Sequence, residues 1–311
     1  MNGSLPSPAV AEDGGTAAQI RALVEPLRRV PDELRRFDKT PEVAAEALGI
    51  DAATLAILLD SGLPHIGSGS ALLFDGRDLR TMSLYLRARS PQHDVMRFWL
   101  RSLRQISAGP VAYRVQIRTS CPVPRHSGAC VYTLPSEFGV RREVVTEERS
   151  GATLGEIVCR TDQLPRQLPA EAAAIASLYY DVDYYYLPPS LTANADFVKR
   201  ERIGDCLATA RAIVESAAEA GLHARLAFGF ILSIPVSCLH TWAEIRLGGC
   251  WYAVDPLMPK ALQAWGIADG QEWQMTLSPF GLYHRISSEQ IRLAWHGGTP
   301  SRAWLPTGFV R

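Results

Sequence analysis

Three residues in the C-terminal half of the chain have the types and the order that nucleophilic acyl chemistry requires. Cys206 begins a long helical run, His240 lies within an extended segment, and Asp255 ends the next extended segment. In such a set a thiol attacks a carbonyl, an imidazole takes the thiol proton, and a carboxylate orients the imidazole. We therefore predict acyl transfer through a thioester, with Cys206 as the nucleophile, His240 as the base and then the acid, and Asp255 as the orienting group.

The segment that carries the cysteine predicts a helix, because alanine dominates it from Cys206 to Gly221. A thiol at a helix N-terminus lies at the positive end of the helix dipole, which favours the thiolate. The unpaired N–H groups of the first turn are also suited to hold an oxyanion. Gly204, two residues before the cysteine, permits a sharp turn into the helix.

The segments that carry the histidine and the aspartate predict consecutive antiparallel strands at 223–233, 238–247 and 250–254. Gly248 and Gly249 join the last two strands as a tight hairpin. Trp242 shares a strand face with His240, and Trp251 shares one with Asp255. Both indoles are candidates to line the site and exclude water from it, with core packing as the alternative.

Four motifs occur in a characteristic order: Gly204-Asp205-Cys206, Gly221-Leu222-His223-Ala224-Arg225, His240-Thr241-Trp242-Ala243-Glu244 and Trp251-Tyr252-Ala253-Val254-Asp255-Pro256. Together they closely resemble the transglutaminase-like (papain-like) core, over about 170–260. The resemblance implies an α+β fold in which a helix carrying the cysteine packs on an antiparallel sheet carrying the histidine and the aspartate. That family includes cross-linking enzymes, peptidases, amidases, inactive members and enzymes that form amides on carrier-protein thioesters.

A second resemblance lies in the N-terminal part, over about 38–90. The segments 43–50, 62–66 and 73–79 resemble the small helix-turn-helix of the excisionase and MerR-like winged-helix group. However, residues 37–90 carry five basic and seven acidic side chains, and the predicted recognition helix at 51–60 has no Arg, Asn or Gln. DNA binding needs cations for phosphates and donors for base edges. We interpret this part as a structural or docking module, with DNA binding as the alternative.

These patterns predict a disordered segment at 1–16, a helical module at 17–108 and a catalytic domain at 109–311. Further helices are expected at 17–36, 92–108 and 170–187, and further strands at 111–119, 129–134 and 140–147. The tyrosine run at 184–186 would form a buried helix end or, alternatively, line an acyl channel. The tail from 261 to 311 would close over the site or complete the sheet.

Composition excludes several classes of protein. The chain of 311 residues is 47% hydrophobic, 21% charged and formally neutral, which is typical of a globular protein and unlike a nucleic-acid or membrane-surface binder. Its longest apolar run, 226–236, is too short to span a bilayer, and its N-terminus lacks the pattern of a secretory signal. We therefore expect a cytoplasmic protein without membrane association.

The six cysteines form no C-x-x-C pair, and the seven histidines show no H-x-x-x-H spacing. A structural zinc site is therefore not expected. The chain also has no calcium-site pattern such as D-x-D-x-D-G, so no calcium site is expected. No other metal and no cofactor are expected, and the thiols are expected to be reduced.

The function expected first is an acyltransferase that forms an amide bond in a biosynthetic pathway. Its partners would be a small-molecule or carrier-bound acyl donor, such as a thioester, ester or amide, and an amine acceptor. The alternative with the same chemistry is a peptidase or amidase, in which water resolves the acyl-enzyme. The alternative from another class is a non-catalytic regulator that binds DNA or protein through residues 38–90.

Overall fold

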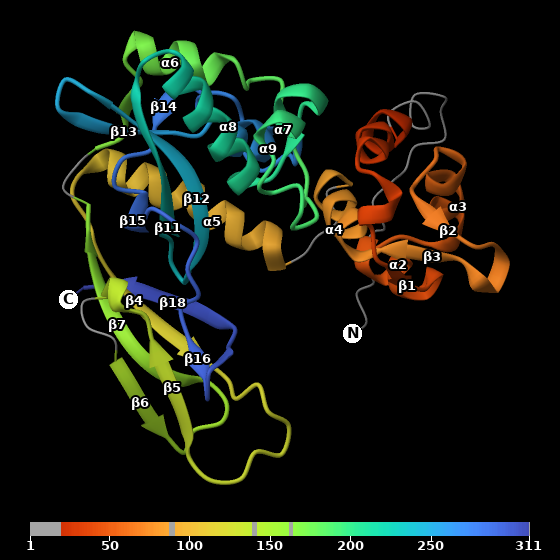
Figure 1. Ribbon diagram of the computed structural model, residues 1–311, viewed down its shortest axis with the longest axis horizontal. Helices are drawn as coiled ribbons and strands as arrows, with labels where there is room; N and C mark the ends of the chain where they lie inside the picture. Colours follow the sequence, from red (N-terminus) through yellow and green to blue (C-terminus); the bar gives the residue numbers. More distant parts are fainter. Residues whose placement is uncertain (1–19, 87–90, 139–141, 162–163, 311) are drawn as a thin grey trace, which may run out of the picture.

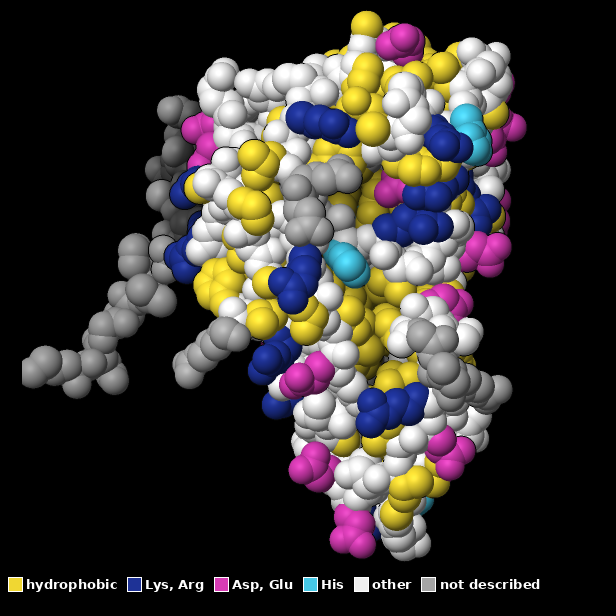
Figure 2. Space-filling model, turned by 90° about the vertical axis from the view of Figure 1, so that its left-hand side faces the viewer, with side chains coloured by type: hydrophobic (Ala, Val, Ile, Leu, Met, Phe, Trp, Pro, Cys, Tyr) yellow, Lys and Arg dark blue, Asp and Glu magenta, His cyan; other side chains and the backbone are white. Residues whose placement is uncertain are grey.

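The computed structural model describes residues 20–86, 91–138, 142–161 and 164–310. They form a mixed α+β structure whose sheets are mainly antiparallel. Figure 1 shows a helical N-terminal module at the right, a sheet covered by helices at the upper left and a narrower β-rich part below. Figure 2 shows the same taper from a broad upper part to a narrow lower end. The predicted disordered segment at 1–16 lies outside the described residues.

The N-terminal module contains a small sheet in the order β1-β3-β2, and α-helices pack beside it. The helices are α2 (Pro41–Leu48), α3 (Ala52–Asp60) and α4 (Gly76–Tyr85), and the strands are β1 (Phe37–Lys39), β2 (His65–Ile66) and β3 (Leu73–Asp75). Side-chain caps explain the starts of α3 and α4, because Asp51 accepts a hydrogen bond from Thr54 N at 2.8 Å and Asp75 accepts one from Arg77 N at 2.6 Å.

The single helix predicted at 17–36 differs from the structure. Its described part is helical over 20–24, continues as the 3-10 helix η1 (Glu25–Arg29) and is interrupted before a second one, η2 (Asp32–Leu34). Pro26 and Pro31 account for the interruption, because proline lacks the N–H that an α-helix needs.

The main sheet has seven strands in the order β15-β11-β12-β18-β4-β7, with β13 also paired to β12. The strands are β4 (Ala112–Thr119), β7 (Ala152–Arg160), β11 (His223–Ile231), β12 (Val236–Leu247), β13 (Cys250–Val254), β15 (Tyr283–Ser287) and β18 (Ala303–Phe309). Strand β12 pairs with β11 along one side, and on its other side with β18 at its start and β13 at its end. The predicted strands near 111, 223, 238 and 250 are confirmed, whereas β7, β15 and β18 are additional.

A four-stranded sheet in the order β17-β16-β5-β6 forms the narrow lower end of the molecule (Figure 1). Its strands are β5 (Cys130–Leu134), β6 (Arg142–Thr146), β16 (Trp295–His296) and β17 (Thr299–Pro300). Strand β16 pairs with β5, so the C-terminal tail returns to a segment far earlier in the chain.

Helices cover the main sheet, and α8 (Cys206–Glu219) packs on β11 and β12. The others are α5 (Pro91–Ala108), α6 (Ala170–Ser177), α7 (Ala195–Glu201) and α9 (Leu257–Ala264), and two short strands, β9 (Asp183–Tyr184) and β10 (Ile203–Gly204), lead into α8. Within the described ranges, no helix has both the length and the apolar surface needed to cross a bilayer.

The tyrosine run at 184–186 is not the helix end that the sequence suggested, because α6 stops at Ser177 and the run is extended. Instead the run attaches the N-terminal module to the sheet. The Tyr85 hydroxyl donates to the Tyr184 carbonyl at 3.0 Å, and the Tyr185 hydroxyl donates to the Leu23 carbonyl at 3.1 Å. These rings bury large area while their hydroxyls keep hydrogen-bond partners, which makes the junction a packed interface.

Candidate active site

The entry to α8 places Cys206 as the first residue of the helix. Asp205 caps the helix by accepting a hydrogen bond from Ala208 N at 2.9 Å, and burial raises the pKa of this carboxyl to about 6. Gly204 is required for a different reason from the sharp turn that the sequence suggested. A Cβ at this position would lie 2.5 Å from Thr209 Oγ1, so the close packing of the helix start demands glycine.

The structure brings the predicted histidine and aspartate into direct contact. His240 Nε2 and Asp255 Oδ2 are 2.7 Å apart, and both side chains are almost fully buried. The pairing of β12 with β13 produces this contact, because Ala243 lies opposite Val254 in the register. The second oxygen of Asp255 accepts a hydrogen bond from Met258 N at 3.2 Å, which fixes the carboxylate at the start of α9.

The protonation of His240 follows from its neighbours. Burial alone would lower its pKa, but the charge and hydrogen bond of Asp255, together with the bond to Cys206, raise the pKa to about 9. The imidazole therefore holds two protons at neutral pH, which is the form that can protonate a leaving group. Cys206 and His240 also line the same cavity, so the thiol and the imidazole face the same space.

Tyr283 is a member of this cluster that the sequence analysis missed. Its hydroxyl donates to Asp255 Oδ2 at 2.5 Å, and its ring lies 5.0 Å from the His240 ring. Burial and the charge of Asp255 raise the pKa of Tyr283 well above its usual range, so the phenol stays protonated and remains a donor. One feature of the sequence could have indicated this contact, a glycine at position 229 inside a predicted strand. A Cβ at Gly229 would overlap the His284 carbonyl, so the glycine allows close approach of β15, the strand that carries Tyr283.

The two tryptophans that were candidates to line the site occupy different places. Trp242 is 1% exposed, and its ring lies parallel to the His240 ring with centroids 6.1 Å apart. It therefore packs behind the imidazole. Trp251 instead lies under the Arg225 guanidinium at 3.8 Å and lines a separate cavity of about 450 Å³.

The cavity at Cys206 has a volume of about 420 Å³ and is closed on one side by the C-terminal tail. It is lined by Cys206, Phe228, Leu239, His240, Thr241, Gln290, Ile291 and Arg292. Gln290 Nε2 donates to Thr241 Oγ1 at 3.1 Å, which holds the tail against β12. The tail thus does both things that the sequence suggested, because β15 extends the sheet and 290–292 form a wall of the cavity.

Two larger grooves flank this cavity. One, of about 660 Å³, shares Phe228, Thr241 and Gln290 with it. The other, of about 920 Å³, shares Leu239, Ile291 and Arg292. The thiol therefore lies in the middle of a cleft that is accessible from two sides.

Comparison with known proteins agrees with the core that these motifs suggested. Residues 160–256 match the family model described as Transglutaminase-like superfamily. The chain also aligns with the crystal structure of "a Putative Cysteine Protease from Cytophaga hutchinsonii" at 12% identity, over 65% of this chain and 89% of that one, with a TM-score of 0.33. A search of curated proteins gives no match.

The α+β fold with a transglutaminase-like core is thereby confirmed, and the match supports a cysteine enzyme of that type. It does not distinguish acyl transfer from peptide hydrolysis. The match does not extend to the N-terminal module, whose likeness to the winged-helix group stays a prediction.

Proposed function

With a transglutaminase-like core as the premise, we propose that this protein forms amide bonds by cysteine-dependent acyl transfer. The observation that carries the proposal is the buried His240–Asp255 pair, which lies with Cys206 at the centre of a cleft that is accessible from two sides. An acyltransferase must bind an acyl donor and an amine acceptor on either side of one thiol, and the cleft offers room for both.

The reaction begins from the pair in which His240 already holds the proton of Cys206, and the thiolate attacks the donor carbonyl. The His240 imidazolium, held by Asp255 at 2.7 Å, then protonates the leaving group, and a thioester remains on Cys206. The amine acceptor next attacks this thioester while His240 takes up the amine proton. Release of the amide restores the thiolate and the imidazolium, because the proton that His240 gave to the leaving group is replaced by the proton from the amine.

The oxyanion that forms in each step needs donors that are fixed before the reaction. The first turn of α8 carries backbone N–H groups next to Cys206, and we assign these groups as oxyanion donors. Gln290 is our candidate for the second donor, because its side-chain amide lines the cavity and has two N–H bonds, one of which reaches Thr241.

The larger groove favours a donor that carries an anionic group. Arg80, Arg292 and Arg302 line it, and no carboxylate is among its lining residues. Arginine binds phosphate and carboxylate oxygens with paired hydrogen bonds. An acyl thioester on the phosphopantetheine arm of a carrier protein, which contains a phosphate, meets this requirement, so a carrier-bound donor is our first choice.

The smaller groove suits the acceptor, because Glu215 and Glu289 lie in its wall. Carboxylates attract a protonated amine and accept its hydrogen bonds. Arg211 in the same wall offers a partner for an acid group on the amine substrate. Hydrolysis by water remains the alternative outcome of the same acyl-enzyme.

The test is the intact mass of the protein after brief exposure to a panel of acyl thioesters and amides, with Cys206→Ser as the matched control. We expect a mass increase in the wild type that equals the acyl group and is absent from the variant. Added amines should then increase the amide product at the expense of free acid. Unchanged free acid at every amine concentration would establish the hydrolase instead, and no adduct with any donor would refute both.

A further inference from the structure

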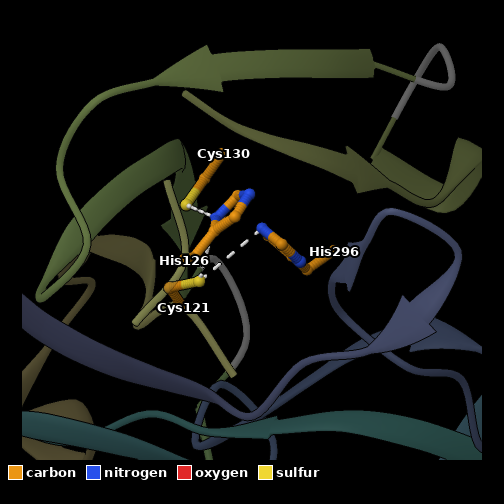
Figure 3. Close-up of side chains that lie close together, drawn as sticks. All are labelled: Cys121, His126, Cys130 and His296. Carbon is orange, nitrogen blue, oxygen red and sulfur yellow. Dashed lines mark hydrogen bonds between the residues drawn. The ribbon is translucent and has the colours of Figure 1, made fainter. Parts of the chain in front are cut away.

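A second cluster of thiols and imidazoles lies in the narrow lower part of the molecule, where no function has been assigned. Cys121 and His126 come from the connection between β4 and β5, Cys130 begins β5, and His296 ends β16. Figure 3 shows the four side chains pointing toward one another. One nitrogen or sulfur atom from each residue can be chosen so that all four atoms lie within 4.8 Å of one another.

The distances in this cluster have the size that a tetrahedral metal site requires. His126 Nδ1 lies 3.4 Å from Cys121 Sγ and 3.2 Å from Cys130 Sγ, and His296 Nε2 lies 3.7 Å from Cys121 Sγ. Tetrahedral zinc, with Zn–S of about 2.3 Å and Zn–N of about 2.0 Å, separates sulfur from nitrogen by about 3.5 Å. The ligand atoms therefore need only small shifts to surround an ion.

We propose that Cys121, His126, Cys130 and His296 bind a structural zinc ion. Two sulfurs and two nitrogens in a compact group select zinc among the common divalent ions, and four protein ligands leave no position for a water or a substrate. Binding displaces the two thiol protons, so Zn²⁺ and the two thiolates form a neutral site with the two imidazoles, and two protons pass to solvent.

The backbone around the cluster is arranged to present these ligands. Arg125, directly before His126, has a φ of 56°, a left-handed conformation that is uncommon for a residue with a side chain. Cys121 N donates to the Arg149 carbonyl at 2.8 Å, and Gly297 N, next to His296, donates to the Val131 carbonyl at 3.1 Å. Both flanks of the cluster are thus held by backbone hydrogen bonds.

The expectation that the chain holds no structural zinc rested on the absence of C-x-x-C and H-x-x-x-H spacings, and this proposal replaces it. The local part of the set has the spacing C-x₄-H-x₃-C, and the fourth ligand lies 175 residues after the first. The ion would join the C-terminal tail to β5. Because the same tail contributes 290–292 to the cavity at Cys206, zinc would also brace that wall.

The first test is the metal content of the full-length protein, purified without chelators and measured by elemental mass spectrometry. We expect about one zinc per chain in the wild type and less than about a tenth of that in Cys121→Ser and His296→Gln. Cys250→Ser, at an exposed thiol, and Cys206→Ser should keep the zinc. A wild type that takes up no zinc even after exposure to Zn²⁺ would overturn the proposal, as would zinc that is lost only in Cys206→Ser.

A second test needs no substitution, so poor folding of a variant cannot obscure it. Iodoacetamide labelling of the native wild type should spare the half-buried Cys121 until a chelator removes the ion, whereas exposed Cys250 should react at once. Replacement of zinc by Co²⁺ should produce the absorption of a tetrahedral cobalt–thiolate centre. Equal labelling with and without chelator, or a disulfide between Cys121 and Cys130 in freshly purified protein, would refute the site.

Discussion

The two thiol–imidazole clusters of this protein use the same types of side chain in opposite ways. At the cleft, the thiol of Cys206 faces an imidazole that is held by a carboxylate. In the lower sheet, Cys121 and Cys130 face two imidazoles, and the group contains no carboxylate. The first arrangement removes and returns a proton beside an open cavity. The second has two thiols and no orienting acid, and it satisfies the coordination of a metal ion.

Two further cysteines, Cys159 and Cys238, belong to neither cluster. Burial raises the pKa of Cys159 to about 12 and that of Cys238 to about 11, so both stay protonated at neutral pH. Neither lies at a helix N-terminus or in the four-residue cluster. The chemistry of a thiol in this fold thus follows from its neighbours, which supply a base, a second thiol or only apolar contacts.

The largest expected effect separates the two clusters directly. Cys206→Ser should reduce acyl transfer by several orders of magnitude, because hydroxyl replaces the nucleophilic thiolate, and should leave zinc content unchanged. Cys130→Ser should remove zinc and retain a measurable acyl-enzyme. Acylation rates and metal content, measured on both variants, check the prediction. If both variants lost acylation and both kept a full complement of zinc, the roles assigned to the two clusters would be wrong.

Asp255→Asn should lower kcat/KM by up to about 10⁴-fold, by analogy with the loss when a triad carboxylate becomes an amide. Asp255 raises the pKa of His240 to about 9 in the folded protein, against 6.5 ordinarily. Activity that depends on the imidazolium should therefore fall as pH rises through about 9, and the variant should lose it at lower pH. The pH–rate profiles of both proteins provide the measurement, and coincident profiles would contradict the assigned role of Asp255.

The same raised pKa has a consequence for stability. A histidine whose folded-state pKa exceeds its unfolded value binds its proton more tightly in the native state. The stabilisation from the His240–Asp255 pair should be complete below about pH 6.5 and lost as pH rises through about 9. Denaturant melts of the wild type and His240→Gln across this range should converge at high pH, and a constant difference would contradict the shift.

Removal of zinc should affect the stability of the lower sheet more than the rate of acyl transfer at Cys206. A ligand present at about 1,000 times its dissociation constant stabilises the folded state by about 4 kcal/mol. Chelation should therefore lower Tm, and it should raise KM more than it lowers kcat, since 290–292 line the cleft and lead into His296. Thermal melts and steady-state rates with and without chelator check this. The Cys206→Ser variant should show the same loss of Tm.

Tyr283→Phe should have a smaller effect, of about tenfold in rate, because it removes one donor from Asp255 and keeps the ring against His240. Tyr283 acts through Asp255 and is a positioning residue. Without the hydrogen bond from the Tyr283 hydroxyl, the negative charge of Asp255 acts more strongly on His240, so the pKa of His240 should rise. The basic limb of the pH–rate profile should therefore move to higher pH. A change in rate with an unmoved profile would indicate only a packing role.

More of the residues of the catalytic cleft than of the cluster in the lower sheet could be predicted from the sequence. Cys206, His240 and Asp255 lie in motifs within one sequential unit, where a helix and a hairpin place them by local geometry. Tyr283 and Gln290 could not be found in this way, because they reach the site through the pairing of β15 with β11 and the path of the tail. His296 reaches the other cluster through a long-range strand pair, and its two-residue strand has no periodic signal.

The smallest expected effect concerns Asp205, which caps the helix that carries Cys206. Burial raises the pKa of the Asp205 carboxyl to about 6, so ionising this group costs more in the folded protein than in the unfolded chain. Its stabilising contribution should be complete below about pH 3.8 and lost as pH rises through about 6. Asp205→Asn keeps an oxygen for the cap without the charge and should match or exceed the wild type in stability at pH 7, whereas Asp205→Ala should lose about 1 kcal/mol. Denaturant melts of the three proteins decide this. Equal loss in Asn and Ala would show that the charge, and not the hydrogen bond, holds the helix start where Cys206 needs it.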